Sequence, residues 1–101
     1  MFVHIALFKW KKGVKEEKID LLLSGLKFLE GRLNGIRSIH IGKNIHPEGK
    51  GFTHGVVVIG ESAEAIQKYR DHPVHLELAG QIDDIESDGI GCDFQDMLVL
   101  F

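Results

Sequence analysis

The stretch Tyr69-Arg70-Asp71-His72-Pro73-Val74-His75 decides how the second half of this chain folds. Proline has no N–H to donate and a fixed φ, so it is tolerated in the first turn of a helix and rarely inside one. We therefore predict that Pro73 begins a new helical turn just after another helix has ended near Tyr69. His72 is the expected N-cap of the new helix, so we assign His72 and Pro73 a structural role. The break places Tyr69, His72 and His75 at a junction between two helices rather than along one helix face. Such a junction can hold a titratable ring and a hydroxyl between rigid elements, as catalysis often requires.

Hydrophobic periodicity on either side of this junction predicts the element order βαββαβ in an α+β protein. An i, i+3, i+4, i+7 stripe of leucines is typical of an amphipathic helix, and β-branched apolar runs are typical of buried strands. Ser62 is the expected N-cap of the helix that ends near Tyr69. We predict the ferredoxin-like arrangement, a four-stranded antiparallel sheet with its helices on one face. The expected strands cover residues 2–9, 36–43, 52–59 and 90–94, and the first helix covers residues 15–33.

The end of the chain leaves the register of the fourth strand open. Ile90–Phe94 has a strand-like pattern, and Met97–Phe101 has one as well. In the first interpretation, residues 96–101 are an apolar C-terminal extension, which either covers a partner subunit or adds a fifth edge strand. For Cys92 we predict a small core residue rather than a nucleophile.

The composition is that of one soluble domain over residues 1–101. Apolar residues make up 44% of the chain and charged residues 27%, which is typical of a globular protein. A net charge of −3 provides no basic surface for nucleic acid or an anionic membrane, so we predict neither partner. A single cysteine excludes an internal disulfide and fits a reducing compartment. No targeting segment is visible, so the expected location is the cytoplasm.

The strands at residues 2–9 and 52–59 are apolar on both faces. Helices on one face of the sheet leave the other face bare, and soluble monomers rarely expose an apolar patch of that size. A two-fold homodimer in which two such faces pack together covers the patch. Burying about 600–800 Å² of apolar sheet per chain contributes roughly 15–20 kcal/mol before association costs, at about 25 cal/mol per Å². We therefore predict a homodimeric α/β barrel.

Four polar rings are the candidates for chemistry. His4 and His54 fall near the third residue of strands that we treat as parallel neighbours, so their rings are expected at a similar height in one pocket. His75 falls near the third residue of the helix that Pro73 begins, where the helix dipole lowers a histidine pKa and keeps a neutral base available. Tyr69 can donate its O–H to a carbonyl or an enolate. Each ring could instead be a structural residue with a satisfied hydrogen bond.

A zinc or non-haem iron centre is not expected among the six histidines. Such a centre needs three or four converging ligands, commonly with a carboxylate. No acidic residue occupies an obvious i+3 or i+4 position beside the pocket rings, and the proline between His72 and His75 keeps these two off one regular helix face. We therefore predict no cofactor and no metal-histidine site.

Together these residues resemble the stress-responsive dimeric α/β-barrel (Dabb) family. The resemblance implies a ferredoxin-like subunit that dimerises into a barrel, with a small-molecule pocket between sheet and helices. Most members have no assigned chemistry, some are plant stress proteins, and one is a plant polyketide cyclase that forms olivetolic acid. The match covers the chain to about Phe94 and is carried by His4, Phe52-Thr53-His54-Gly55, Tyr69-x-x-His72-Pro73-x-His75 and Asp93-Phe94.

The resemblance to the cyclase implies that His75 is the general base and that Tyr69 assists it. It also implies that His4 and His54 bind the substrate. The loop at residues 44–51 differs from the family, so no substrate shape follows. Some members hold a cation on backbone carbonyls near the end of the first helix, and the matching carbonyls here are those of Glu30, Leu33 and Ile36.

Two functions remain open. One is a cofactor-independent enzyme that catalyses enolisation or an aldol-type ring closure of a small apolar or polyketide-like ligand, with His75 as the base. The other is a non-catalytic, ligand-binding or stress-related structural homodimer, in which the same polar side chains fix a ligand or only stabilise the fold. The residues alone separate these two functions poorly.

Overall fold

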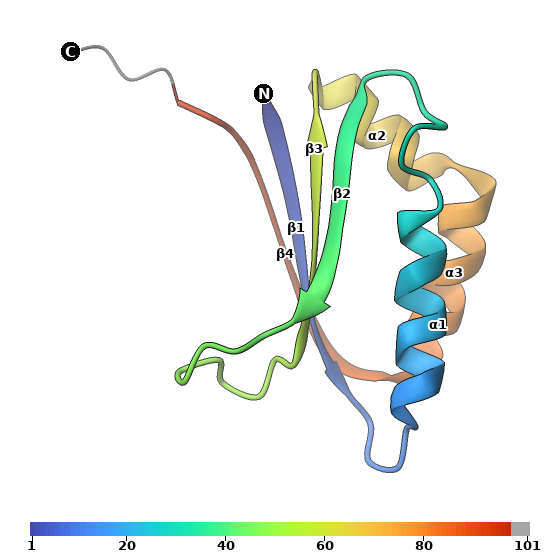
Figure 1. Ribbon diagram of the computed structural model, residues 1–101, viewed down its shortest axis with the longest axis vertical. Helices are drawn as coiled ribbons and strands as arrows, with labels where there is room; N and C mark the ends of the chain where they lie inside the picture. Colours follow the sequence, from blue (N-terminus) through green and yellow to red (C-terminus); the bar gives the residue numbers. More distant parts are fainter. Residues whose placement is uncertain (98–101) are drawn as a thin grey trace.

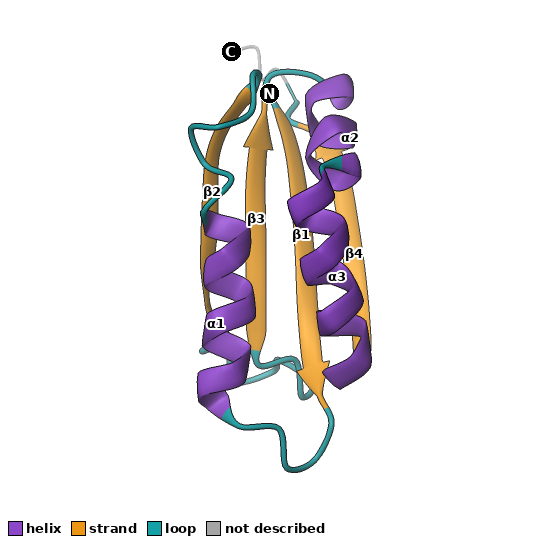
Figure 2. Ribbon diagram, turned by 90° about the vertical axis from the view of Figure 1, so that its right-hand side faces the viewer, coloured by secondary structure: helices purple, strands orange, loops and turns teal. Residues whose placement is uncertain are grey.

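The computed structural model describes residues 1–97 as one antiparallel sheet with three helices on one of its faces (Figure 1). The view turned by 90° shows all three helices in front of the sheet (Figure 2). The strand order is β2-β3-β1-β4, so the predicted ferredoxin-like fold is confirmed. The elements are β1 (Phe2–Trp10), α1 (Glu16–Lys27), β2 (Ile36–Lys43), β3 (His54–Gly60), α2 (Ala63–Asp71), α3 (Pro73–Ile85) and β4 (Glu86–Gln95).

β1 and β3 run antiparallel, so the expectation that they are parallel neighbours was wrong. The crossover through α1 makes β1 parallel to β2, and β3 then returns between them as the second strand of a hairpin. As a result His4 pairs with Val58, while His54 pairs with Phe8 near the other end of the sheet. Four residues of strand separate the two levels by about 14 Å, so the two rings are not at a similar height.

The core lies between the sheet and the helices. The leucine stripe of α1 places Leu22, Leu23 and Leu26 there, each at most 3% exposed. These side chains belong to one apolar cluster with Val56 and Val58 of β3. Because successive side chains of a strand point to opposite faces, only every second residue of β3 is buried in this core.

α1 ends at Lys27 rather than at residue 33 as predicted. Residues 28–35 continue as turns, in which the N–H of Leu29 donates to the carbonyl three residues earlier. Gly31 and Gly35 have φ angles of 78° and 84°, in the left-handed region that favours glycine, and they redirect the chain toward β2. Leu29 is still only 1% exposed, so the apolar stripe extends beyond the regular helix.

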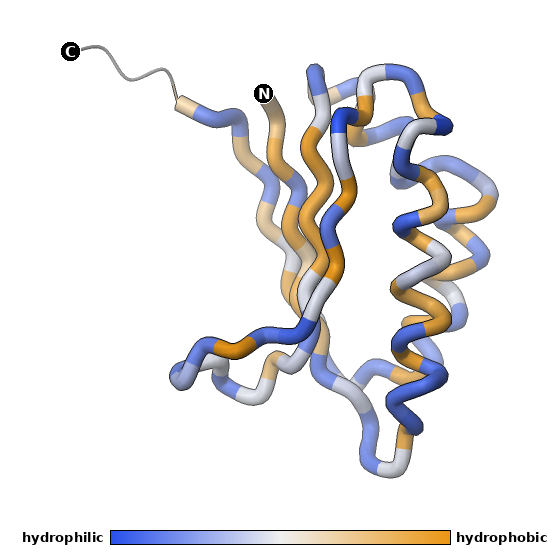
Figure 3. Tube along the Cα trace, viewed as in Figure 1, coloured by the Kyte–Doolittle hydropathy of each residue, from blue (hydrophilic) through white to orange (hydrophobic). Residues whose placement is uncertain are grey.

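Within residues 1–97, no helix lies on the other face of the sheet (Figure 3), and the side chains of that face are mainly apolar, as the sequence predicts. Ile90 and Phe94 on this face are 57% and 45% exposed. Cys92 pairs with Ile5 on the same face and is exposed, so the expected core position of Cys92 was wrong for the single chain. The apolar side chains of this face are Val3, Ile5, Leu7, Val57, Ile59, Ile90, Cys92 and Phe94.

The fourth strand corresponds to the first of the two registers considered. β4 reaches Gln95, and beyond it the N–H of Asp96 donates to the Met1 carbonyl at 2.8 Å. The alternative strand at Met97–Phe101 falls, apart from its first residue, outside the described residues. Among the helices of residues 1–97, none is both long enough and apolar enough to cross a membrane.

The junction between α2 and α3 is a single extended residue, His72. α2 ends at Asp71 and α3 begins at Pro73. Nδ1 of His72 accepts the N–H of Val74, the second residue of α3, at 3.1 Å and so caps this helix. The break lets Tyr69 and His75 approach each other from two different helices.

Candidate functional site

Polar side chains gather at two places on the helix-facing side of the sheet, at opposite ends of β1 and β3. We call these places the His4 cluster and the His54 cluster. Their separation follows from the antiparallel register of the two strands. The His4 cluster consists of His4, Tyr69, Arg70, His75 and Asp93. The His54 cluster consists of Trp10, Glu16, Asp20, Lys43, Thr53 and His54.

His4 is bound to its cross-strand neighbour on β4. Nδ1 of His4 lies 2.6 Å from Oδ1 of Asp93, and the two residues are direct partners in the β1–β4 register. Arg70 of α2 forms an ion pair with the second oxygen of the same carboxylate. Nη2 of Arg70 also lies 3.2 Å from Nδ1 of His4, but a guanidinium only donates hydrogen bonds. Asp93 therefore accepts from both groups and holds them together.

The contact with Asp93 fixes the form of the His4 ring. A carboxylate only accepts hydrogen bonds, so Nδ1 of His4 carries the proton and Nε2 keeps a lone pair. Burial, and after it the positive charge of Arg70, lowers the pKa of His4 to about 4. The Asp93 carboxylate favours the charged ring, but its own charge is neutralised by Arg70. The ring is therefore neutral at physiological pH and offers an acceptor nitrogen.

Tyr69 and His75 meet beside this pair. Their ring centroids are 4.7 Å apart in an edge-to-face arrangement, and Tyr69 lies 5.9 Å from the His4 ring. Burial raises the pKa of Tyr69 to about 12, so its hydroxyl stays protonated and can donate. Burial is also the main cause that lowers the pKa of His75, while the backbone of Arg70 acts in the opposite direction. The sequence pointed to the helix dipole as the cause, whereas the largest cause in the structure is burial.

His75 has a ring nitrogen that is buried and unpaired. Its Nδ1 is shielded from solvent, and no group of residues 1–97 reaches it with hydrogen-bond geometry, although the Arg70 backbone lies close enough to the ring to raise its pKa. A buried polar atom left without a partner costs about 1–3 kcal/mol. Proteins keep such an atom where a ligand or an ordered water completes its hydrogen bond.

A cavity of about 320 Å³ opens beside the His4 cluster. Arg70 and Asp93 line it, and His4, Tyr69 and His75 are not among its lining residues. A ligand held in this cavity therefore meets the Arg70–Asp93 ion pair before it meets the three rings. The apolar wall of the cavity includes Phe2, Val3, Ala63, Ile66 and Phe94.

His54 is fixed at the other end of the sheet by two neighbours. Nε1–H of Trp10 donates to Nδ1 of His54 at 2.9 Å, and the Thr53 hydroxyl lies 2.8 Å from the same nitrogen. An indole N–H can only donate, so Nδ1 is an acceptor and the ring proton lies on Nε2. His54 is 6% exposed, and its Nε2 has no hydrogen-bond partner in the part of the chain that the structure describes. Burial lowers the pKa of His54.

Two carboxylates of α1 approach this ring. One ligating atom from each of Glu16, Asp20 and His54 lies within 4.8 Å of the other two. Glu16 also forms an ion pair with Lys43 of β2. Two cavities, of about 390 and 380 Å³, are both lined by His54 and Lys43. The sequence offered no acidic partner for a pocket histidine, and the fold supplies two.

The structure thus brings together three of the four rings that the sequence singled out. His4, Tyr69 and His75 form one cluster, whereas His54 belongs to the other. Sequence reasoning missed the roles of Asp93 and Arg70. A correct antiparallel register would have found Asp93, because cross-strand partners share a face of the sheet. Arg70 carries no sequence signal that separates it from an ordinary surface arginine.

Of the three backbone carbonyls considered as cation ligands, those of Glu30 and Leu33 lie in the turns after α1, and that of Ile36 belongs to the first residue of β2. The Leu33 carbonyl accepts the N–H of Ile36 at 3.3 Å. Glu30 is engaged through its side chain, whose Oε2 accepts the N–H of Ile39 at 2.6 Å. A cation on these carbonyls stays a prediction.

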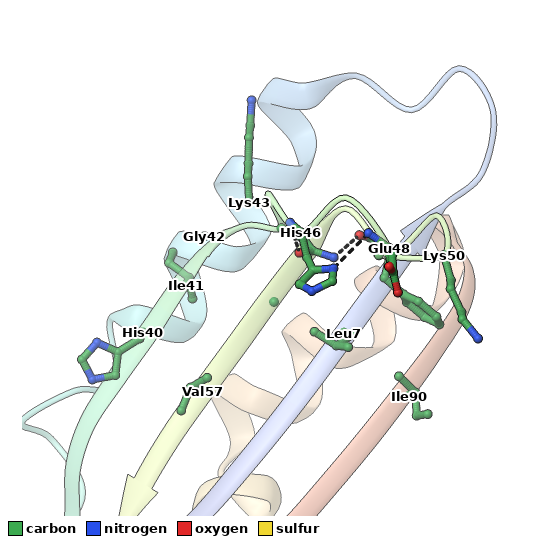
Figure 4. Close-up of a pocket in the computed structure, with 14 residues that line it drawn as sticks. Leu7, His40, Ile41, Gly42, Lys43, His46, Glu48, Lys50, Val57 and Ile90 are labelled. Atoms are coloured by element: carbon green, nitrogen blue, oxygen red, sulfur yellow. Dashed lines mark hydrogen bonds between the residues drawn. The ribbon is translucent and has the colours of Figure 1, made fainter.

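A cavity of about 660 Å³ lies on the uncovered face of the sheet (Figure 4) and shares only Lys43 with the His54 cluster. Leu7, Val57 and Ile90 form its apolar floor, and the loop between β2 and β3 forms its rim. In that loop Nδ1 of His46 accepts the N–H of Glu48 at 2.9 Å. The position makes this cavity part of the apolar face rather than of either polar cluster.

Comparison with known proteins agrees with this architecture. Residues 2–96 match the sequence model of the stress-responsive A/B barrel domain, Dabb. The chain is 36% identical over 78 residues to a stress-response A/B barrel domain-containing protein of Arabidopsis thaliana, covering 75% of this chain and 72% of that protein. It is 29% identical over 75 residues to the olivetolic acid cyclase of Cannabis sativa, covering 72% of this chain and 74% of the cyclase.

Solved structures show the same fold. A crystal structure of an Arabidopsis thaliana protein matches with a TM-score of 0.86 and 29% identity, over 100% of both chains. A dimeric ferredoxin-like protein of unknown function from Thermobifida fusca matches with a TM-score of 0.80 and 22% identity, over 92% and 88% of the two chains. The hydroxynitrile lyase of Passiflora edulis matches with a TM-score of 0.85 and 16% identity, over 98% and 95%. The last two likenesses concern the fold alone.

Proposed function

This chain belongs to the stress-responsive A/B barrel domain family, and on that premise we propose that it catalyses proton transfer on a small polyketide-like ligand at the His4 cluster, without a cofactor. The reaction class is enolisation followed by aldol-type ring closure. One observation carries the proposal: the buried His75 ring, whose Nδ1 is unpaired within residues 1–97, lies edge-to-face with Tyr69 at 4.7 Å between ring centroids. The likeness to olivetolic acid cyclase supports the ligand class.

In this mechanism His75 is the base and Tyr69 is the hydrogen-bond donor. The neutral imidazole takes a proton from a carbon between two carbonyl groups, and the C–H electron pair forms an enolate. Tyr69 donates its O–H to the enolate oxygen and lowers the energy of the charge that develops there. The enolate carbon then bonds to a second carbonyl carbon, whose oxygen takes the electron pair and receives the proton back from His75. No electrons are gained or lost overall, so the step needs no redox partner.

His4 and Asp93 support this chemistry in different ways. Nε2 of His4 has a lone pair and can accept a hydrogen bond from a ligand hydroxyl. Asp93 holds the His4 ring through its contact of 2.6 Å with Nδ1 and is a positioning residue. Arg70 neutralises that carboxylate, which keeps the imidazole from being charged before a ligand arrives.

A non-catalytic, ligand-binding homodimer is the second candidate, and one observation favours it. The cavity of about 320 Å³ beside the His4 cluster is lined by Arg70 and Asp93 but not by the three rings. A ligand that stays in this cavity would be held by its contacts with the ion pair and the apolar wall. In that case the rings serve to stabilise the fold.

The test is turnover of a linear tetra-β-keto thioester, with the ring-closed product followed by mass spectrometry. The wild-type protein is expected to form the cyclic product faster than buffer does. His75→Gln is expected to lower the rate at least 100-fold, since a positioned general base contributes about 10²–10⁴. His40→Gln, at an exposed histidine of β2, is the matched control and should retain full activity.

The outcomes separate the two candidates. Full activity of His75→Gln contradicts its assignment as the base. A wild-type protein that turns over nothing, yet binds the ring-closed product with shifts at Arg70 and Asp93 in NMR spectra, supports the binding protein instead.

We also propose that the protein is a homodimer formed through its uncovered sheet face. The support is the continuous apolar surface of that face and the dimeric state of the Thermobifida fusca protein with the same fold. The wild-type chain is then expected to sediment at twice its mass of 11.3 kDa at micromolar concentration. Ile5→Asp places a charge in the middle of the face and should give the single chain, while Lys68→Asp on the exposed side of α2 should leave the dimer intact. A wild-type species of 11.3 kDa would overturn the proposal.

A further inference from the structure

We propose that Glu16, Asp20 and His54 form a binding site for a divalent transition-metal ion such as Zn²⁺. The site lies in the His54 cluster, at the end of the sheet remote from His75 and Tyr69, and is independent of the proposed reaction. It joins the first two turns of α1 to the first residue of β3.

The positions of the two carboxylates follow from the helix. Glu16 and Asp20 are four residues apart on α1, so they lie on the same face of the helix, one turn above the other. One ligating atom of each lies within 4.8 Å of the other and of a His54 ring nitrogen. Ligands around one tetrahedral Zn²⁺ are about 3.3 Å apart, since each bond is about 2.0–2.1 Å long. Both carboxylates are exposed and can close the remaining distance by rotation of their side chains.

The state of His54 is the independent observation that points to a ligand. Nδ1 of His54 already receives hydrogen bonds, so Nε2 is the nitrogen left for a ligand. That Nε2 is inaccessible to solvent and unpaired among the described residues, in a side chain that is only 6% exposed. Native proteins rarely leave a buried polar atom in this state. An exposed pair of acids alone would not indicate a site, but an orphan imidazole beside them does.

The charges of the site also fit a divalent cation. Two carboxylates and a neutral imidazole neutralise a 2+ ion, and oxygen and nitrogen donors of this kind suit Zn²⁺. In the absence of a metal ion, the ammonium group of Lys43 pairs with Glu16 and neutralises one of the two carboxylates. The ion therefore competes with the Lys43 ammonium, and removing Lys43 should strengthen metal binding.

Metal binding at Nε2 requires a change of tautomer that can be observed. The ring proton must move from Nε2 to Nδ1, where it faces the donor-only indole N–H of Trp10. The Thr53 oxygen, 2.8 Å from Nδ1, can accept this proton in a new hydrogen bond. The Trp10–His54 hydrogen bond is then lost. Trp10 is the single tryptophan of the sequence, so its fluorescence reports on this one contact.

The experiment is a titration of the full, untagged chain with ZnCl₂, recorded by calorimetry and by tryptophan emission. We expect one ion per chain and a change in Trp10 emission that saturates at the same stoichiometry. Asp20→Asn should weaken binding at least tenfold because it removes one of three ligands. Lys43→Met should tighten binding severalfold. Glu17→Gln, beside Glu16 but outside the cluster, is the matched control and should bind as the wild type does.

Three results would overturn the proposal. The first is the absence of binding at 100 µM Zn²⁺ in a folded wild-type chain. The second is binding that Asp20→Asn leaves unchanged. The third is binding without any change in Trp10 emission, because the ion then rests on the carboxylates and not on His54. None of these results bears on the chemistry proposed for His75.

Discussion

His4 and His54 lie on the same face of one sheet, on neighbouring strands, yet their rings are held in opposite tautomers. Asp93 accepts the proton of Nδ1 in His4 and leaves Nε2 as an acceptor. Trp10 donates to Nδ1 in His54 and leaves Nε2 as a donor. The partner of one ring nitrogen therefore decides what the other nitrogen can do. Residue type and position in a strand do not determine which tautomer a histidine adopts.

The largest expected effect is on the stability of the His4 cluster. Tyr69 is 1% exposed and packs against both His4 and His75. Tyr69→Ala should lower the free energy of unfolding by about 3–5 kcal/mol, because it leaves a large cavity. Urea denaturation at fixed protein concentration measures this loss. If the two clusters are independent, the emission of Trp10 in the folded variant stays that of the wild type.

Tyr69→Phe is the control for this prediction. It keeps the ring and removes only the hydroxyl, so its loss should be at most about 1 kcal/mol. A Tyr69→Phe variant that is as unstable as Tyr69→Ala would show that the hydroxyl, rather than packing, stabilises the cluster. A shift of Trp10 emission in either variant would show that the two clusters are coupled.

An intermediate effect is expected from pH. The pKa of His4 is about 4 in the folded chain, against 6.5 for an ordinary histidine. Between these values the unfolded chain binds more protons than the folded chain, so stability falls as the pH drops from 6.5 to 4. The full shift corresponds to about 3 kcal/mol, and solvent screening of the partly exposed ring reduces this to about 1–2 kcal/mol.

His4→Gln is the matched variant for the pH prediction. Denaturant titrations of the wild type and the variant, at several pH values from 7 to 4, give the difference in slope. The variant should lose less stability than the wild type over this window. Equal losses would mean that the His4 ring titrates normally in the folded chain.

The smallest effect is on the tautomers themselves. Nitrogen-15 NMR of histidine-labelled protein should show the proton of His4 on Nδ1 and that of His54 on Nε2. Asp93→Ala removes the acceptor and should relax the preference of His4 by about 1 kcal/mol without changing His54. Trp10→Phe removes the donor to His54 and should relax the tautomer preference of His54 without changing His4. Finding the same tautomer at both rings of the wild type would remove the basis of the comparison.

Much of the fold could be predicted because it depends on local patterns. The βαββαβ order follows from periodicity, and Ser62 caps α2 by accepting the N–H of Ala65 at 3.0 Å, as its position suggests. The uncovered apolar face follows from strands that are apolar on both sides. The end of α1 was misplaced because the buried stripe continues through Leu29, and periodicity alone does not distinguish a helix from consecutive turns.

The pairing of the site residues could not be predicted from local patterns. The strand positions of His4 and His54 predict neighbouring rings only if β1 and β3 run in the same direction. In the antiparallel sheet the same two positions lie at opposite ends. The contacts of His54 with Trp10 and with the carboxylates of α1 join residues more than thirty positions apart. They arise only when the whole sheet and its helices are assembled, so no short segment of sequence encodes them.

The exposed position of Cys92 allows the dissociation rate of the proposed homodimer to be measured. In the proposed homodimer this thiol, opposite Ile5 on the apolar face, is covered by the second chain. A thiol reagent in excess then reacts only during the moments when the two chains are apart. The labelling rate becomes independent of reagent concentration and equals the rate of dissociation. Labelling of the single cysteine of the sequence therefore reports the lifetime of the homodimer.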